Sequence, residues 1–236
     1  YKGISHTGKS GIEKQYERAL VGSTGFEEVE IDAHGRTLRT ISREGAIPGD
    51  NLRLTIDIEL QREARRALGA SRGAVVAMDP SNGEVLAMVS NPSFDPNLFV
   101  DGIDHATYSA LRSLKDKPFL NRALHGRYAP GSTIKPIFAE VVIEEGIDPE
   151  ESVFCPGWYM LPGSTRQYRC WKKTGHGRVD LHAAIEQSCD VYFYEMGKRL
   201  GIGQMSGVLK KFGLGSQSGV DLPGEPDGLV PSAEWK

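Results

Sequence analysis

The chain has 236 residues, of which 39% are hydrophobic and 25% are charged, and its formal net charge is −3 at pH 7. This composition is typical of a globular protein with one large or two modest domains, and the small negative charge gives no electrostatic case for binding nucleic acid. No apolar run approaches the roughly 20 residues that cross a bilayer.

The start of the chain is polar and predicts a small lobe of its own. Ser10 and Glu13 have the spacing of a capping box at the start of a helix. The Gly- and Pro-containing residues 45–50 mark the end of the lobe, so we expect domains at 1–50 and 51–236. The elements expected in the lobe are a helix over 12–20 and a hairpin of strands over 26–32 and 36–41.

The main domain begins with signals for strands and continues with signals for helices. Apolar and polar residues alternate over 52–58, which predicts a strand with one wet face. Residues 79–83 (DPSNG) are a strong hairpin signal, and strands followed by helices predict an α+β fold. Also expected are hairpin strands over 74–78 and 84–89, helices over 59–68, 106–114, 181–187, 191–200 and 202–212, and a long irregular excursion over 148–177.

Ser132 and Lys135 lie one helical turn apart at the start of a predicted helix over 132–146. Pro130 and Gly131 end the preceding segment, so Ser132 opens the helix. Residues three apart share a helix face, and the Lys135 amine can therefore reach the Ser132 hydroxyl. A serine becomes a nucleophile when a neighbouring amine takes its proton, and a helix N-terminus favours the negative charge that develops. The pair predicts nucleophilic catalysis.

The same spacing also arises by chance, and its alternative interpretation is a serine that caps the helix beside a solvated lysine. Pro136 in the first turn and the apolar residues 137–139 indicate a helix that enters the core with its start exposed. A lysine at the mouth of such a helix is partly desolvated, which favours the catalytic interpretation.

Several motifs resemble those of a known family. Ser132 to Lys135, followed later by Ser188-Cys189-Asp190, resembles the first two motifs of the penicillin-recognising serine acyltransferases, S-x-x-K and S-x-N. Three stretches are similar to class B penicillin-binding proteins: residues 6–14 (HTGKSGIEK), 75–96 (VVAMDPSNGEVLAMVSNPSFDP) and 128–136 (YAPGSTIKP). The similarity spans nearly the whole chain. It implies a penicillin-binding-protein/serine β-lactamase-like transpeptidase fold, an antiparallel sheet flanked by helices, with a small N-terminal pedestal lobe.

The resemblance implies a peptidoglycan D,D-transpeptidase that cross-links stem peptides during cell elongation. Ser132 would attack the carbonyl between two terminal D-alanines, Lys135 would act as the base, and Ser188 would relay a proton to the leaving amine. β-Lactam antibiotics would acylate the same serine, and the chemistry needs no cofactor. On the residues alone, Ser188 and Asp190 could instead cap the helix that follows them.

Asp190 departs from the asparagine of the usual second motif, and this variant resembles the elongation-specific penicillin-binding protein 2 group. Its carboxylate can hold the charge of Lys135, so the base would need substrate binding to be activated. The third family motif, K-[ST]-G, does not follow Asp190. Residues 9–11 and 173–175 have these letters but precede Ser188, and we interpret both as coincidental.

We therefore expect the chain to be a C-terminally incomplete part of a longer protein and to be inert alone. It starts at Tyr1 with no signal peptide before it. The resemblance implies a membrane anchor upstream and a place on the periplasmic face of the bacterial inner membrane. It also implies a membrane glycosyltransferase and other elongation-complex proteins as partners.

Two other functions stay open. A catalytically silent β-lactam receptor or binding module would use the same cleft. The aspartate at position 190 and the absence of the third motif leave this alternative open. A D,D-carboxypeptidase or β-lactamase-type hydrolase fits less well, because the pedestal-like lobe suits a scaffolded synthase.

A second constellation contains every cysteine of the chain: Cys155, Cys170 and Cys189, together with His176. Four such ligands suit tetrahedral zinc in a closed structural site. If the residues on either side of Cys189 face the cleft, Cys189 faces the excursion that carries the other three, and zinc would help to position the second motif. The resemblance also implies a metal site here with ligands from Asp, His and Cys. A Cys155–Cys170 disulfide and three buried thiols are the alternatives.

The remaining aromatic and histidine residues are interpreted as structural. The excursion has four aromatics that could line a groove for glycan or peptide but more often pack such a loop down: Trp158, Tyr159, Tyr168 and Trp171. The residues of the later helix that are expected in the core are Tyr192, Phe193, Tyr194 and Met196. His125 and His182 are interpreted as ordinary surface or core histidines.

Overall fold

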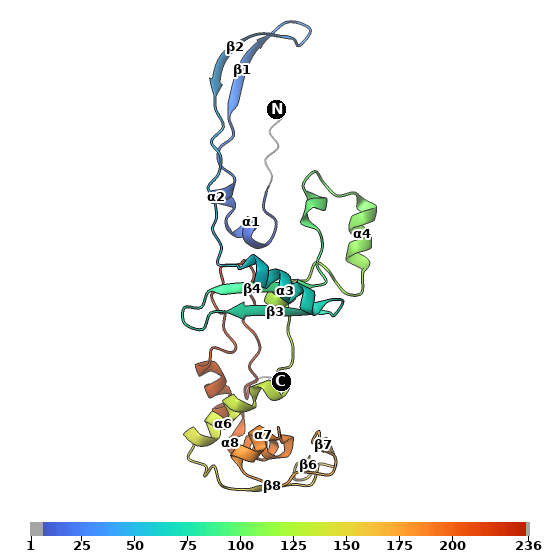
Figure 1. The fold of residues 1–236 in the computed structure, drawn as a ribbon, viewed down its shortest axis with the longest axis vertical. Helices are drawn as coiled ribbons and strands as arrows, with labels where there is room; N and C mark the ends of the chain where they lie inside the picture. The colour runs from blue at the N-terminus through green and yellow to red at the C-terminus, as the bar shows by residue number, and fades with distance from the viewer. Residues whose placement is uncertain (1–6, 235–236) are drawn as a thin grey trace. The chain divides into compact units, whose positions relative to one another are not determined.

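The computed structural model describes residues 7–234, so His6, the first residue of the 6–14 motif, lies outside the described residues. It contains two compact units. The first runs through Gly126 and also contains Gly219–Glu225, and the second comprises Arg127–Ser218 and the residues from Pro226. Both units combine helices with antiparallel strand pairs (Figure 1), which confirms the predicted α+β class. The predicted domain boundary at residue 50 lies inside the first unit and stays a prediction.

The first unit opens with two short helices where the sequence predicted one. They are α1 (Gly11–Gln15) and α2 (Glu17–Leu20). The break lies at Tyr16, whose backbone leaves the helical range with φ −107° and ψ 21°. The Ser10 side chain makes no capping bond, so the predicted capping box is wrong. Instead, the Glu17 carboxylate accepts the N–H of Gly8 at 2.5 Å, and this bond ties the entry of the chain to α2.

The predicted N-terminal hairpin is confirmed. It consists of β1 (Phe26–Ile31) and β2 (Thr37–Glu44), paired antiparallel with register shifts after Glu28 and Glu30. Every residue of β2 is exposed, so no core holds this hairpin. Cross-strand bonds to glutamates of β1 supplement its ladder, and their donors are Arg39, Thr40 and Ser42.

The strand predicted over 52–58 is wrong. The Asp57 N–H does reach the Leu86 carbonyl at 2.9 Å. However, the Asp57 side chain accepts two N–H groups in the first turn of α3 (Ile58–Leu68) and so starts the helix. Because the helix begins at once, the alternating residues before it do not form a ladder. α3 itself confirms the helix predicted over 59–68.

The second predicted hairpin is formed by β3 (Gly73–Met78) and β4 (Val85–Asn91), and α3 lies along it (Figure 1). Gln61 of α3 acts like a strand partner, since its amide accepts the Met88 N–H at 2.7 Å and donates to the Met88 carbonyl at 3.0 Å. The other helices of this unit are η1 (Pro96–Phe99, a 3-10 turn), α4 (His105–Ser113), which confirms the helix predicted over 106–114, and α5 (Arg122–His125).

The second unit packs helices beside short strand pairs. The excursion over 148–177 was predicted to be irregular, but it supplies most of two antiparallel pairs, β5 with β8 and β6 with β7. That prediction is wrong because strands of three residues are too short to produce a periodic signal. In chain order the elements are η2 (Gly131–Ile134, a 3-10 turn), α6 (Lys135–Glu144), β5 (Val153–Cys155), β6 (Trp158–Met160), β7 (Gln167–Arg169), β8 (Gly177–Val179), α7 (Leu181–Glu186) and α8 (Asp190–Lys211).

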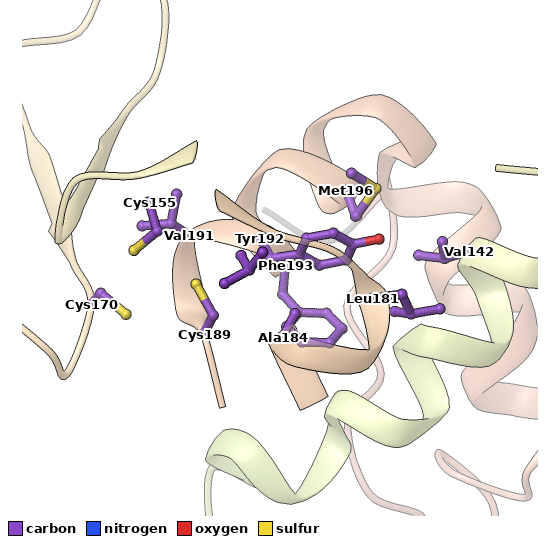
Figure 2. Packing of buried hydrophobic residues seen from close by; sticks show 11 residues of the cluster. Val142, Cys155, Cys170, Leu181, Ala184, Cys189, Val191, Tyr192, Phe193 and Met196 are labelled. Atoms are coloured by element: carbon purple, nitrogen blue, oxygen red, sulfur yellow. The ribbon is translucent and has the colours of Figure 1, made fainter. Parts of the chain in front are cut away.

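The core of the second unit lies where α6, α7 and α8 meet, and Figure 2 shows the residues buried there. Tyr192, Phe193 and Met196 are buried as predicted. α8 covers the two helices predicted over 191–200 and 202–212. A kink separates them at Gly201, whose backbone leaves helical geometry at φ 77° and ψ 165°. No helix in the described part of the chain is long and apolar enough to span a bilayer.

The aromatic residues of the excursion divide into two kinds. Tyr159 and Tyr168 are half-buried and pack on Tyr194, with ring centroids 5.9 Å apart in both pairs. Tyr194 is 37% exposed, so its prediction as a core residue is wrong. Trp158 and Trp171 are 41% and 64% exposed, so neither is packed down by burial, although the Trp171 ring meets the ring of His176 in the same excursion.

Candidate active site

Ser132 lies on the 3-10 turn η2 that leads into α6. The helix predicted over 132–146 therefore starts with a tighter turn and ends at Glu144. Pro130 precedes the turn and Gly131 has φ 59°, a backbone range that favours glycine. The Ser132 side chain is exposed and makes no hydrogen bond within the part of the chain that the structure describes. It is therefore not a helix cap, and its hydroxyl is accessible.

Lys135, the first residue of α6, is 7% exposed, and its ammonium group is fully hydrogen-bonded. The Nζ atom donates to the Ser188 carbonyl at 2.7 Å, to Ser188 Oγ at 3.0 Å and to Asp190 Oδ1 at 2.6 Å. An ammonium group has three donors, so none is left for Ser132, and the contact predicted between Ser132 and Lys135 is not made as a hydrogen bond. These bonds offset the cost of burying the charge.

Asp190 completes the ion pair from the first residue of α8, where a helix N-terminus favours negative charge. Its Oδ1 accepts from Lys135, and its Oδ2 accepts the backbone N–H of Trp171 at 3.1 Å. Neither oxygen caps α8, so the capping interpretation of Asp190 is wrong. The side chains of Lys135 and Asp190 are only 9% and 23% exposed, which limits screening of the pair by salt.

Ser188 joins α7 to α8 in a left-handed conformation with φ 52°. The turn is a Schellman motif, because the Ser188 N–H donates to the Ile185 carbonyl at 3.1 Å and the Cys189 N–H donates to the Ala184 carbonyl at 2.8 Å. Glycine usually occupies this position, since a side chain is strained there. The turn directs both the carbonyl and the hydroxyl of Ser188 at Lys135. Ser188 thus ends α7, and its interpretation as the N-cap of α8 is wrong.

We expect Ser188→Gly to be more stable than Ser188→Ala by about 1 kcal/mol. Both variants lose the hydroxyl that contacts Lys135, but only glycine relieves the left-handed backbone. Thermal unfolding of the two variants in the complete protein measures the difference, and a higher melting temperature is expected for glycine. Equal melting temperatures would show that the backbone at Ser188 is not strained.

The four residues of the second constellation meet in one place. The ligand atoms of Cys155, Cys170, His176 and Cys189 all lie within 4.8 Å of one another. Figure 2 shows the sulfur atoms of the cysteines turned toward a common space. Nδ1 of His176 is 3.6 Å from Sγ of Cys155 and 3.6 Å from Sγ of Cys170. All the cysteines are free and buried, so the alternative of a Cys155–Cys170 disulfide is wrong.

These positions fit a tetrahedral zinc ion. With Zn–N of about 2.0–2.1 Å and Zn–S of about 2.3 Å, a tetrahedron has N···S edges of about 3.6 Å, which both separations from His176 match. Burial lowers the pKa of His176, which keeps the imidazole neutral as a ligand must be. Burial also raises the pKa of the Cys189 thiol to about 12, so a bound metal would have to displace its proton. His176 Nε2 is buried without a hydrogen-bond partner among the described residues.

Trp171 has a role at this site that sequence reasoning missed, since it was considered only as a groove-lining or packing aromatic. It follows Cys170 in the chain, and its backbone N–H donates to Asp190. Its indole Nε1–H donates to the Gln187 carbonyl at 2.9 Å. A backbone donor leaves no signal in residue type, so only the place of Trp171 beside Cys170 could have pointed to it.

The other sequence candidates contribute nothing to this arrangement. Lys9-Ser10-Gly11 leads into α1 in the first unit, and Lys173-Thr174-Gly175 lies between β7 and β8. Neither sequence lies on a strand, in agreement with their interpretation as coincidental. His125 and His182 are exposed.

Family models match both parts of the chain. The model described as penicillin binding protein transpeptidase domain matches residues 73–236, and the model described as penicillin-binding protein dimerisation domain matches residues 1–54. The peptidoglycan D,D-transpeptidase MrdA of Acinetobacter baumannii is 49% identical over the whole chain. The chain spans 35% of the length of that relative.

Solved structures confirm the predicted fold. Pseudomonas aeruginosa PBP2, solved in complex with WCK 5153, is 44% identical with a TM-score of 0.83, over 100% of this chain and 48% of that one. Helicobacter pylori PBP2, solved in complex with MreC, is 36% identical with a TM-score of 0.82, over 96% of this chain and 42% of that one. The chain thus corresponds to under half of each of these structures.

Proposed function

The chain belongs to the penicillin-binding protein transpeptidase family, and from this premise we propose that the complete protein is a peptidoglycan D,D-transpeptidase of cell elongation. It would cross-link stem peptides through a serine acyl-enzyme and would be acylated by β-lactams at the same serine. One observation carries the proposal. The buried ammonium of Lys135 is hydrogen-bonded by Ser188 and Asp190. Lys135 lies on α6, and the turn that leads into α6 presents the exposed hydroxyl of Ser132.

Ser132 is the proposed nucleophile. Its Oγ attacks the carbonyl carbon between two terminal D-alanines, a C–O bond forms, and the hydroxyl proton passes to the Lys135 amine. Lys135 can accept that proton only as a neutral amine. Asp190 Oδ1, 2.6 Å from Nζ, can take the extra proton of the resting ammonium. Substrate binding would then have to turn the freed amine toward Ser132.

Ser188 is the proposed proton relay. Its Oγ is 3.0 Å from Nζ of Lys135. The proton can move from Lys135 through Ser188 to the leaving D-alanine nitrogen as the C–N bond breaks. The amine of a second stem peptide then attacks the ester carbonyl. The C–N bond of the cross-link forms, the C–O bond to Ser132 breaks, and the proton lost by the amine returns to the Ser132 oxygen. The left-handed backbone of Ser188 supports this role because it aims the hydroxyl at Lys135.

Zinc is the proposed resident metal, held by Cys155, Cys170, His176 and Cys189. Four protein ligands leave no open position, so the ion would supply structural cross-linking and no Lewis-acid chemistry. Cys189 lies between Ser188 and Asp190 in the chain, and Cys170 lies next to Trp171. Holding both cysteines would therefore fix the segment that binds Lys135 and the segment whose backbone N–H binds Asp190.

We place the complete protein at the periplasmic face of the inner membrane, where peptidoglycan is assembled. The relative from Helicobacter pylori was solved with MreC, which supports partners in an elongation complex. A membrane glycosyltransferase is a further proposed partner, because new glycan strands must be supplied for cross-linking.

A catalytically silent β-lactam receptor is the second candidate function. It is favoured by the commitment of all three Lys135 donors to Ser188 and Asp190, which leaves Ser132 without an activating contact. A hydrolase of the carboxypeptidase or β-lactamase type would differ from both by releasing the bound acyl group rapidly.

Fluorescent penicillin applied to the complete protein separates these functions. The transpeptidase proposal expects stable covalent labelling that disappears in Ser132→Ala, because the nucleophile is gone. Thr133→Ser is the matched control, since it keeps a hydroxyl bonded to the Pro130 carbonyl one residue away and should be labelled normally. Absence of labelling in the unmodified protein removes the enzyme proposal. Loss of the label within minutes favours a hydrolase, and labelling without cross-linking of stem peptides favours a silent receptor.

A further inference from the structure

The two oxygens of Asp190 serve two different donors. Oδ1 accepts from the Lys135 ammonium at 2.6 Å, and Oδ2 accepts the backbone N–H of Trp171 at 3.1 Å. An ionised carboxylate is an acceptor on both sides. The carboxylate is therefore fixed in rotation, because each oxygen is held by its own donor from a different segment of the chain.

We propose that Trp171 is a positioning residue whose backbone N–H makes aspartate the required residue at position 190. Asparagine has one acceptor oxygen and one donor NH₂ group. Whichever way its amide is turned, the NH₂ group faces either the Lys135 ammonium or the Trp171 N–H. One donor is then left without an acceptor in a mostly buried site, which is unfavourable. The proposal rests on the proposed function only in taking the Lys135–Asp190 pair as part of the catalytic machinery.

Trp171 is held in place by contacts that do not involve Asp190. Its indole Nε1–H donates to the carbonyl of Gln187, the C-cap residue of α7. Its ring meets the His176 ring edge to face, with centroids 5.3 Å apart. The indole remains 64% exposed, so burial of its surface does not account for its position, and the polar bond to the end of α7 does.

Trp171 thus bridges the end of α7 and the start of α8. The indole donates to the carbonyl of Gln187, the residue before Ser188 in the chain. The backbone N–H donates to the carboxylate of Asp190, two residues after Ser188. One residue of the neighbouring loop therefore binds Asp190 directly and binds the residue that precedes Ser188. This makes the position of Lys135 depend on that loop, although no side-chain atom of Trp171 touches the lysine ammonium.

The experiment compares Asp190→Asn with and without the Trp171 N–H in the complete protein. Nonsense suppression with indole-3-lactic acid replaces this N–H by an ester oxygen and keeps the indole. With the natural backbone, Asp190→Asn should lower the rate of acylation by fluorescent penicillin roughly 100-fold, and with the ester by roughly 10-fold or less. Loss of the carboxylate charge is common to both comparisons, so the difference between them isolates the N–H.

Trp171→Phe is the matched control. It removes the indole donor and keeps the backbone N–H, and the adjacent backbone is still held by the bond from the Cys170 N–H to the Gly157 carbonyl at 2.9 Å. Asp190→Asn should be as harmful in this background as in the natural one. An equal penalty in the natural and ester backbones would overturn the proposal, and so would relief of the penalty by Trp171→Phe. If Asp190→Asn folds but is too unstable for the labelling assay, the same comparison is made on melting temperatures, which the ester should raise. Lack of labelling in the unmodified protein would be a failure of the proposed function instead.

Discussion

Lys135→Met in the complete protein is expected to lower the rate of acylation by penicillin at least about 1,000-fold. Methionine replaces the apolar stem of lysine and lacks only its terminal amine, so it cannot take the Ser132 proton, and a positioned general base contributes up to about 10⁴-fold. The variant also leaves the Asp190 carboxylate without its cation in a mostly buried site, which costs roughly 3–5 kcal/mol of folding free energy. A time course of labelling and a melting curve measure the two effects.

The double variant Lys135→Met with Asp190→Asn separates catalysis from stability. Once the ammonium is gone, asparagine can turn its oxygen toward the Trp171 N–H, and no charge is left unpaired. Most of the stability lost in Lys135→Met should return, while acylation stays at the low rate. Acylation of Lys135→Met within tenfold of the unmodified protein would contradict the role of the lysine as base.

Cys189→Ser is expected to abolish zinc binding and to destabilise the second unit. A neutral hydroxyl replaces one of the thiolates that soft metal ions prefer, and zinc binding contributes directly to the folding free energy of such sites. Acylation should fall as well, because the altered residue lies between Ser188 and Asp190. The zinc content of the purified complete protein, measured by elemental mass spectrometry, should fall from about one ion per chain to near zero.

Val191→Ala is the matched control for this prediction. Val191 is 2% exposed and belongs to the same buried cluster as Cys189, but it offers no ligand. Its truncation should cost about 1–3 kcal/mol through lost packing and leave the zinc content unchanged. An unmodified protein purified without zinc and unaffected by strong chelators would contradict a resident metal.

The candidate site could be predicted in large part because it is built from residue types that are informative by themselves: a lysine at the start of a helix that enters the core, and cysteines with a histidine. A buried lysine needs charged or polar partners, and Ser188 and Asp190 are the partners that the motif resemblance implied. Cys155 and Cys189 are far apart in the chain, yet both belong to one set of soft ligands, so residue type alone brought them together correctly.

The parts that could not be predicted depend on backbone groups and on short elements. The alternation of apolar and polar residues over 52–58 is typical of a strand, but the side chain of Asp57 caps a helix that starts there instead. The hydrogen bond expected from Lys135 to Ser132 follows from helical spacing, and it fails because Ser188 and Asp190 from another segment use all three donors of the ammonium. Spacing along one helix carries no information about such competitors.

The most direct measurement is to locate the penicillin adduct within the complete protein by mass spectrometry. Trypsin should release residues 128–166 as one peptide, since Pro136 protects the bond after Lys135. This peptide contains Ser132, Ser152 and Ser164, and fragmentation distinguishes them. We expect an adduct on Ser132 alone, and an adduct on any other residue, or none at all, would contradict the role of Ser132 as the nucleophile.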